Sequence, residues 1–326
     1  MNSKSIKTAE GKLTPDDIAT GSTIAGIMGL NPFTTANDIL ARAFDATQGI
    51  PRKELTFEAL HWGTTFEVHI VNEACARLGL GNPKTTFGKA YFHEHYPMAV
   101  SLDATVAGDG MTVYNDYDKN IICANADSIV LDGIGVIEGK LTSNERQNEL
   151  PDYRGKIQLQ MAMDITGAKW GAVTVLHRGI FLMTHVFQRD EEMIARIRDA
   201  AVDFNRRVKK YVEAQETEWY QFTTTDSASK IFDKAIDDEI SLPELEADVQ
   251  SIQEIQADIK DLTTQLDITQ ARIMGKMGDY KRLRAGRYDV VWGELHYKAV
   301  PEKVVPAKEA RIIRVSKLKV KENDNV

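Results

Sequence analysis

The chain has 326 residues, of which 43% are hydrophobic and 27% are charged, proportions that are ordinary for a soluble globular protein. Its length fits one large domain or two smaller ones. The net charge of −8 argues against a protein that coats nucleic acid without specificity, although it leaves room for a local basic channel.

Membrane proteins and disulfide-framework proteins are also disfavoured by the sequence. No apolar run is long enough to cross a bilayer, and the first residues lack the apolar core of a secretion signal. The only cysteines, Cys75 and Cys123, do not have the spacing of a metal cluster or of a disulfide framework. We therefore expect a cytoplasmic protein without a membrane partner.

Three helices are predicted in the first 80 residues. A short helix within residues 20–30 lacks the lysine of a phosphate-binding loop, which excludes a nucleoside-triphosphate site of that type. An amphipathic helix follows over residues 35–48. A longer helix covers residues 56–78, with Leu60, Phe66 and Ile70 in its apolar stripe. Glu67 lies beside that stripe, where the pattern alone favours a solvated glutamate.

Three strands are predicted next, over residues 97–107, 121–131 and 134–141. A turn signal at Asp132-Gly133 separates the last two, so the pattern predicts a three-stranded meander that closes with a hairpin. These runs carry the acidic residues of interest, because Asp103 lies in the first, Asp127 in the second and Glu138 in the third.

The following segment completes an α/β pattern. A helix is predicted over residues 152–165, then a strand hairpin over 170–177 and 180–187, then a long helix from 191 to about 216. This order predicts a mixed sheet flanked by helices. The last helix has a basic face that is either a solvated surface or a strip for a nucleic-acid backbone. Its basic residues are Arg196, Arg198, Arg206, Arg207, Lys209 and Lys210.

A polar, low-complexity stretch then divides the chain. We interpret residues 221–242 as a linker between a domain over residues 1–220 and an appendage over residues 243–326. The appendage begins with a long helix over 243–278, whose apolar residues recur at spacings of three, four and seven. Residues 288–292 and 311–315 are predicted to form a small strand pair.

Residues of the strands and of the following helix can converge on one site. Glu138 and Lys140 point to the same face of a strand, because side chains alternate along it. If Asp103 lies on the paired strand, two carboxylates and an ammonium meet and can hold a hard divalent cation. Gln158 and Gln160 interrupt an apolar helix surface, so we expect at least one of them to face a polar site.

Five short segments occur in a fixed order between residues 15 and 210, and together they indicate a family. With them the chain resembles the YqaJ-type viral recombinases, the lambda-exonuclease-like branch of the PD-(D/E)XK nucleases. The resemblance implies a PD-(D/E)XK core, with the long C-terminal helix and strand pair as additions outside it. The segments are Gly21-Ser22 to Asn31-Pro32, Trp62-Gly63 to Glu67, Ser101-Leu102-Asp103, Val136 to Lys140, and Gln158-Leu159-Gln160 leading to Thr166-Gly167.

The resemblance assigns roles to the converging residues. It implies that Asp103 and Glu138 ligate Mg²⁺ or Mn²⁺ and that Glu67 holds the metal, or a water on it, from its helix. Lys140 is implied to orient or deprotonate the attacking water, and Gln158 to position the nucleophile. Metal and lysine together suit phosphodiester cleavage, which needs both charge neutralisation and a hydroxide-like nucleophile.

The same resemblance implies contacts with DNA and with other proteins. Ser22, Ser101 and Gln160 are implied to lie near DNA phosphates, and duplex DNA ends are the implied substrate. A phage enzyme of this kind acts in the host cytoplasm as a 5′-to-3′ exonuclease, passes single strands to an annealing protein and forms a homo-oligomeric ring.

Several alternatives remain open at the level of sequence. The gap between Asp103 and Glu138 is longer than in compact relatives, which makes Asp127 a rival for the aspartate role. The arginine that should precede Ser22 is missing, since Pro15 stands there. An endonuclease with the same chemistry is one alternative, and a non-catalytic scaffold that oligomerises through the helix over 243–278 is another.

Overall fold

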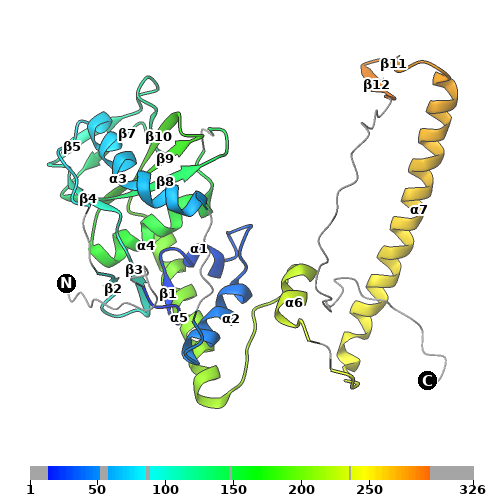
Figure 1. The fold of residues 1–326 in the computed structure, drawn as a ribbon, viewed down its shortest axis with the longest axis horizontal. Helices are drawn as coiled ribbons and strands as arrows, with labels where there is room; N and C mark the ends of the chain where they lie inside the picture. The colour runs from blue at the N-terminus through cyan, green and yellow to red at the C-terminus, as the bar shows by residue number, and fades with distance from the viewer. Residues whose placement is uncertain (1–13, 52–57, 86–88, 147–148, 235, 294–326) are drawn as a thin grey trace, which may run out of the picture. The chain divides into compact units, whose positions relative to one another are not determined.

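The computed structural model describes residues 14–51, 58–85, 89–146, 149–234 and 236–293. Its chain divides into two units, Met1–Ile231 and Phe232–Val326. Figure 1 labels most of the helices and strands of both units. Within the described ranges, no helix combines the length and the apolar character that a membrane span requires.

Five strands of the first unit form a mixed sheet, as predicted. The pair β4–β8 is antiparallel, β8–β9 parallel, β9–β10 antiparallel and β10–β6 parallel. The confirmed hairpin β9–β10 turns at Arg178 and Gly179, both with positive φ. The strands, in spatial order, are β4 (Ala104–Ala107), β8 (Ile134–Thr142), β9 (Trp170–His177), β10 (Phe181–Gln188) and β6 (Ile121–Cys123).

Two helices cover the two faces of this sheet (Figure 1). Residues alternate along β8, so Ile137 joins a buried cluster with Val71 of α3 (Glu58–Leu78). Its neighbour Val136 joins another cluster with Leu159 of α4 (Ile157–Thr166). The alternation therefore puts odd-numbered residues of β8 under α3 and even-numbered residues, including Glu138 and Lys140, under α4.

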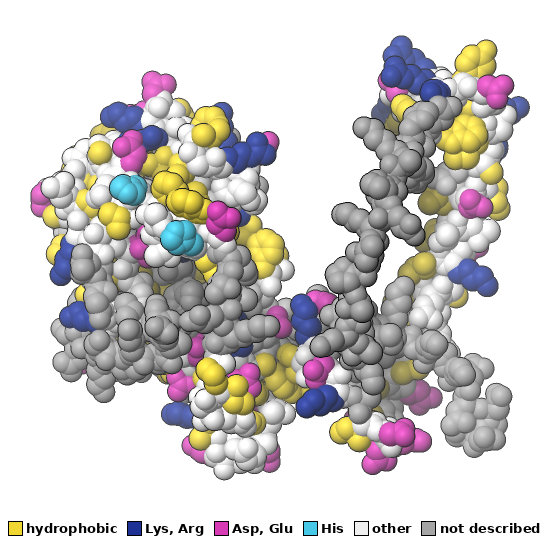
Figure 2. Space-filling model, viewed as in Figure 1, with side chains coloured by type: hydrophobic (Ala, Val, Ile, Leu, Met, Phe, Trp, Pro, Cys, Tyr) yellow, Lys and Arg dark blue, Asp and Glu magenta, His cyan; other side chains and the backbone are white. Residues whose placement is uncertain are grey.

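The first half of α3 departs from its predicted burial. Leu60 and Phe66 were expected in the buried stripe, but they are 50% and 38% exposed. Only the second half of the helix packs on the sheet, through Ile70, Val71 and Ala74. Hydrophobic side chains are accordingly visible on the outer surface of this unit in Figure 2.

A second group of helices forms its own core next to α4. The central helix is α5, whose Ile197 and Phe204 are fully buried. Its aspartate N-cap, Asp190, accepts from the backbone N–H of Met193 at 3.0 Å, which fixes the start of the helix. This helix, α5 (Glu191–Ala214), is packed by α1 (Ile24–Ile27) and α2 (Ala36–Thr47).

Two smaller sheets account for the remaining strands of the first unit. In one, β3 lies between parallel β1 and antiparallel β2. In the other, β5 and β7 pair in antiparallel fashion. Their bounds are β1 (Ala19–Thr20), β2 (Tyr91–Phe92), β3 (Met98–Val100), β5 (Met111–Tyr114) and β7 (Ser128–Leu131).

The predicted meander is wrong, because two of its runs are each split between sheets. Residues 97–107 form β3 and β4, which pair with β1 and β8, and Ser101 to Asp103 connect the two. Residues 121–131 form β6 and β7, separated by a turn in which Asn125 has a φ of 58°. Since β7 pairs with β5, the turn at Asp132-Gly133 leads into a different sheet.

The helix predicted over 152–165 is also interrupted. A widened turn, η1 (Asp152–Lys156), precedes α4, and Gly155 within it has a φ of 94°. This left-handed conformation favours glycine, so the break is specified locally. At the other end, α4 stops at Gly167, which has a φ of 74°.

The second unit consists of a long helix and a strand hairpin. A single turn, η2 (Pro243–Leu245), leads into α7 (Glu246–Met277), which confirms the predicted long helix. The strand pair joins β12 (Tyr288–Val291) to β11 (Arg282–Ala285). The partner predicted at residues 311–315 lies outside the described residues. Within the predicted linker, α6 (Thr225–Ile231) packs on α2, where Ser227 Oγ lies 3.0 Å from Thr35 Oγ1.

The close contact between Gly135 and Trp170 yields a stability prediction. A Cβ at Gly135 would lie 2.3 Å from Trp170 Cε2, and this indole is fully buried. We expect Gly135→Ala to lower the free energy of unfolding by about 1–3 kcal/mol, measured by urea denaturation. The control is Gly63→Ala in α3, where an added Cβ meets nothing within 4 Å. The free energy of unfolding of this control should rise by about 0.5–1 kcal/mol. Equal losses of stability in both variants would contradict the close packing at Gly135.

Candidate active site

The antiparallel pairing of β4 with β8 places Asp103 beside Glu138. The register sets Ala104 against Ile137, so Asp103, one residue earlier, stands across from Glu138. Asp103 Oδ2 accepts a hydrogen bond from the backbone N–H of Gly139 at 2.9 Å. This bond holds the Asp103 carboxylate beside β8.

Glu138 and Lys140 form an ion pair on the α4 face of the sheet. Lys140 Nζ donates to Glu138 Oε1 at 2.5 Å and to Gln158 Oε1 at 3.3 Å. Glu138 is 1% exposed, so its charge is almost wholly removed from water. An unpaired carboxylate at such a depth would be costly, and Lys140 and Gln158 reduce that cost.

Two glycines allow the chain to close around this pair. A Cβ at Gly139 would lie 3.5 Å from Glu67 Cγ and 3.3 Å from Val71 Cγ2, so α3 approaches the strand closely there. Gly155 of η1 approaches from the other face, where a Cβ would lie 3.5 Å from Glu138 Cγ. Glu67 is therefore brought to the site over Gly139, whereas sequence pattern alone favoured a solvated position.

Burial and neighbouring charges shift the pKa values of Glu67, Glu138 and Lys140. Burial raises the pKa of the Glu138 carboxyl, the Asp103 charge raises it further, and Lys140 opposes both. Burial and Asp103 likewise raise the pKa of Glu67 to about 7. Burial lowers the pKa of Lys140, but the charges of Glu138 and Asp103 outweigh it and the pKa is raised. The site thus holds more negative charge than one ammonium neutralises.

The chemistry of these donors fits a hard divalent cation. No group of three or more His, Cys, Asp or Glu side chains forms a ready-made metal cage within the part of the chain that the structure describes. Mg²⁺ does not need one, because it keeps several waters and is held by one or two carboxylates together with substrate phosphates. Asp103 and Glu138 supply such oxygens, and a cation there would relieve their repulsion.

Asp127, the rival aspartate, lies in a different part of the unit. It is exposed and immediately precedes β7, which pairs with β5 outside the five-stranded sheet. Its carbonyl accepts a hydrogen bond from the backbone N–H of Asn115 at 3.3 Å. The strand pairing therefore brings Asp103, and not Asp127, to Glu138.

The two predicted phosphate-binding serines follow the parallel strands β1 and β3. Ser22 is exposed, with its Oγ 3.3 Å from Thr20 Oγ1, and Ser101 is half-buried. Gly21 packs against the residue that holds Lys140, because a Cβ there would lie 3.1 Å from Gln158 Cγ. The parallel register thus puts both serines at the edge of the sheet where Gln158 enters the site.

Gln160, the third predicted phosphate ligand, is bonded elsewhere. It is 2% exposed, its Nε2 donates to the Gln188 carbonyl at 2.9 Å, and its Oε1 accepts from the Asp190 N–H at 2.9 Å. These bonds join α4 to the start of α5. Gln158 and Gln160 point to different sides of the helix, and it is Gln158 that bonds to Lys140.

The basic face of α5 is largely neutralised by acidic neighbours. Arg206 and Arg207 both pair with Asp203 and Glu218, and Lys210 pairs with Glu218. In the same helix, the Arg198 guanidinium pairs with a buried aspartate of α4. Such pairs favour a solvated, internally balanced surface over a free strip for a phosphate backbone.

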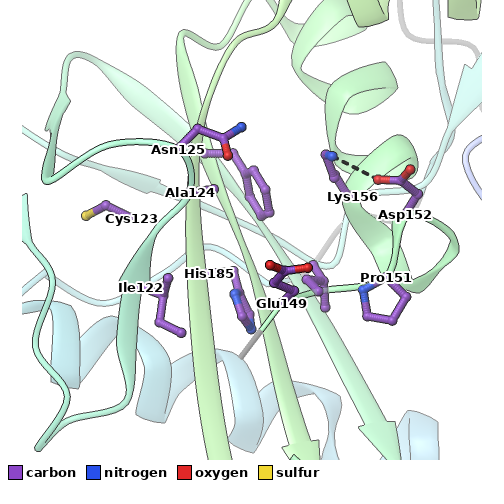
Figure 3. Close-up of a pocket in the computed structure, with 11 residues that line it drawn as sticks. Ile122, Cys123, Ala124, Asn125, Glu149, Pro151, Asp152, Lys156 and His185 are labelled. Atoms are coloured by element: carbon purple, nitrogen blue, oxygen red, sulfur yellow. Dashed lines mark hydrogen bonds and ion pairs between the residues drawn. The ribbon is translucent and has the colours of Figure 1, made fainter. Parts of the chain in front are cut away.

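A cavity of about 660 Å³ lies on the α4 face of the sheet beside η1 (Figure 3). The strand registers align Glu138 with Val173 and Val173 with His185, so the cavity begins two strands, about 10 Å, from the carboxylates. Burial lowers the pKa of His185 to about 4, which keeps its ring neutral. No motif singled out this histidine. Polar and aromatic residues around the cavity are Asn125, Glu149, Asp152, Lys156, His185 and Phe187.

Comparison with solved structures finds nuclease-fold neighbours at low similarity. An alkaline exonuclease from Laribacter hongkongensis is 16% identical, with a TM-score of 0.45, over 62% of this chain and 92% of that one. The structure of this exonuclease in complex with dAMP is 17% identical, with a TM-score of 0.44, over 66% of this chain and 95% of that one. A phage-related exonuclease from Haemophilus somnus 129PT is 11% identical, with a TM-score of 0.39, over 61% of this chain and 96% of that one. No family model and no curated protein matches the chain. These similarities are too low to assign a function.

The raised pKa of Glu67 yields a prediction for the metal-free protein. We expect its carboxyl, followed by ¹³C NMR, to titrate near pH 7. Asp103→Asn should lower this pKa because it removes a negative neighbour, and Lys140→Met should raise it because it removes a positive one. Asp127→Asn is the control and should change nothing. Titration of Glu67 at its ordinary pKa in the wild type would contradict this description of the site.

The same shift has a consequence for stability. The native state keeps a proton on Glu67 that the unfolded state has released, between the ordinary pKa of 4.5 and the raised pKa of about 7. The contribution of Glu67 to stability is therefore lost as the pH rises through this window.

Proposed function

We propose that the protein is a metal-dependent deoxyribonuclease that hydrolyses phosphodiester bonds. The observation that carries this proposal is the convergence of Asp103, Glu138 and Lys140 from two adjacent strands, with Glu67 brought over Gly139 by α3. Two carboxylates and an ammonium at one site suit metal-assisted phosphate chemistry better than acyl or hydride transfer.

Each residue has a task that follows from its contacts. Asp103 and Glu138 would hold Mg²⁺, or Mn²⁺ in its place, with Glu67 in support. When bound, the cation supplies neutralisation of the charge that develops on the phosphate. Lys140 is fixed between Glu138 and Gln158, and from there it orients the attacking water and stabilises negative charge. Gln158 acts as a positioning residue for the Lys140 ammonium.

A finer proposal concerns the substrate. We infer that the enzyme is a 5′-to-3′ exonuclease that acts on duplex DNA ends and passes single strands to an annealing protein. The motif order supports this, and so does the placement of Ser22 and Ser101 at the edge of the site near Gln158. An endonuclease with the same chemistry is the alternative.

A matched pair of aspartate variants tests the nuclease proposal. We expect Asp103→Asn to lower the turnover rate on DNA with Mg²⁺ by on the order of 10³-fold, because it removes a charge that the cation needs. Lys140→Met should cause a similar loss. Asp127→Asn should retain wild-type turnover, since Asp127 is exposed and precedes a strand that pairs outside the five-stranded sheet. Activity that survives EDTA, or equal losses in both aspartate variants, would refute the assignment.

The form of the DNA separates the two kinds of nuclease. We expect linear duplex with 5′ ends to be degraded to mononucleotides while closed-circular duplex stays intact, as seen on a sequencing gel. Ser22→Ala should slow digestion of 5′-phosphorylated ends more than that of 5′-hydroxyl ends, because a serine hydroxyl donates to phosphate oxygens. Nicking of the closed circle would instead support the endonuclease.

A further inference from the structure

An apolar row runs along α7 without a partner among the described residues. Its central members are Ile255, Ile259, Leu262 and Leu266, which are 54%, 58%, 63% and 58% exposed. Hydrophobic side chains recur along this helix in Figure 2. A helix of 32 residues that exposes such a row to water is unfavourable, and exposed apolar patches of this kind mark association sites. We propose that the α7 of a second copy of this chain covers the row in antiparallel orientation.

The spacing of the row suits a helical partner. Ile252, Ile259, Leu266 and Ile273 lie seven residues apart, with Leu262 between the middle two, as in a two-stranded coiled coil. The row is also self-complementary under a twofold axis between Lys260 and Asp261. In that register Ile259 meets Leu262 of the second copy and Ile255 meets its Leu266. All four central layers are then apolar, which is what a symmetric dimer interface requires.

The charges at the two ends of α7 choose the orientation. Glu246 and Asp248 lie in its first turn, and Arg272 and Lys276 lie near its end. An antiparallel pair brings the acidic end of each copy beside the basic end of the other. A parallel pair would place like charges together at both ends, which is unfavourable.

The same charges exclude two other kinds of partner. Between Glu246 and Met277 the helix has six acidic and three basic residues. Helices that lie on membranes carry lysine and arginine on their polar face to meet anionic lipid, and DNA-binding helices need positive charge as well. A second copy with a complementary end supplies the apolar cover without that requirement. Association through α7 does not depend on the nuclease proposal.

Sedimentation velocity of the full-length protein tests the association. We expect Ile259→Glu combined with Leu262→Glu to halve the mass and to raise the dissociation constant by roughly a hundredfold or more, because carboxylates would be buried in the interface. Thr264→Glu, on the outer face of the helix, is the matched control and should keep the wild-type mass. A wild-type mass that the double variant leaves unchanged would overturn the proposal.

Cross-linking tests the orientation. Cys75 and Cys123 are buried, so a short bismaleimide should react only with introduced cysteines. Ile255→Cys and Leu266→Cys proteins should cross-link when mixed, and neither should cross-link alone. The two copies of residue 255 would lie about 16 Å apart along an antiparallel pair. Cross-linking of each variant with itself would show a parallel pair. No cross-linking in a monomeric wild type would show that a second copy does not cover the row. Either result overturns the proposal.

Discussion

The buried ion pair between Glu138 and Lys140 is the interaction on which the site depends. A carboxylate that is 1% exposed is tolerated only with a partner, and the strand itself supplies that partner two residues later on the same face. The residue between them has to be small, because α3 packs directly over it. The sequence Glu138-Gly139-Lys140 therefore satisfies the packing of α3 as well as the pairing of the buried charge. A side chain larger than a methyl group at Gly139 would clash with Val71 and Glu67 of α3.

The pair leaves an excess of negative charge, and this excess gives the site its chemical character. The Gly139 N–H donates to Asp103 and so holds its carboxylate beside Glu138. Glu67 approaches from the opposite face of the sheet, and one ammonium serves three acids. Burial first, and the charge of Asp103 second, raise the pKa values of Glu67 and Glu138. Such an acidic site is electrostatically complementary to a divalent cation, which can in turn bind a phosphate.

Sequence reasoning succeeded where the information is local and failed where it depends on strand pairing. The shared face of Glu138 and Lys140 follows from strand alternation, and the long helix α7 follows from its periodicity. The splits after Val100 and after Cys123 were missed, because the short polar interruptions that follow them do not reveal that the two halves pair with different strands. Gln158 and Gln160 were equivalent as interruptions of an apolar surface, and only the position of α5 shows that Gln160 bonds to Asp190.

Neither unit is basic overall, since residues 1–231 have 24 basic and 30 acidic residues and residues 232–326 have 16 and 18. Under the proposed function, the acidic excess of α7 makes this helix a poor surface for DNA, and the acidic site of the first unit would make the contact with phosphate through its cation. In the first unit, Asp203 pairs with Arg206 and Arg207 and so neutralises charge on the face of α5. An excess of negative charge is instead gathered around Glu138. Under the proposed function, a chain with a net charge of −8 can act on DNA, because a cation at the carboxylates, and not a basic surface, would provide the attraction at the scissile bond.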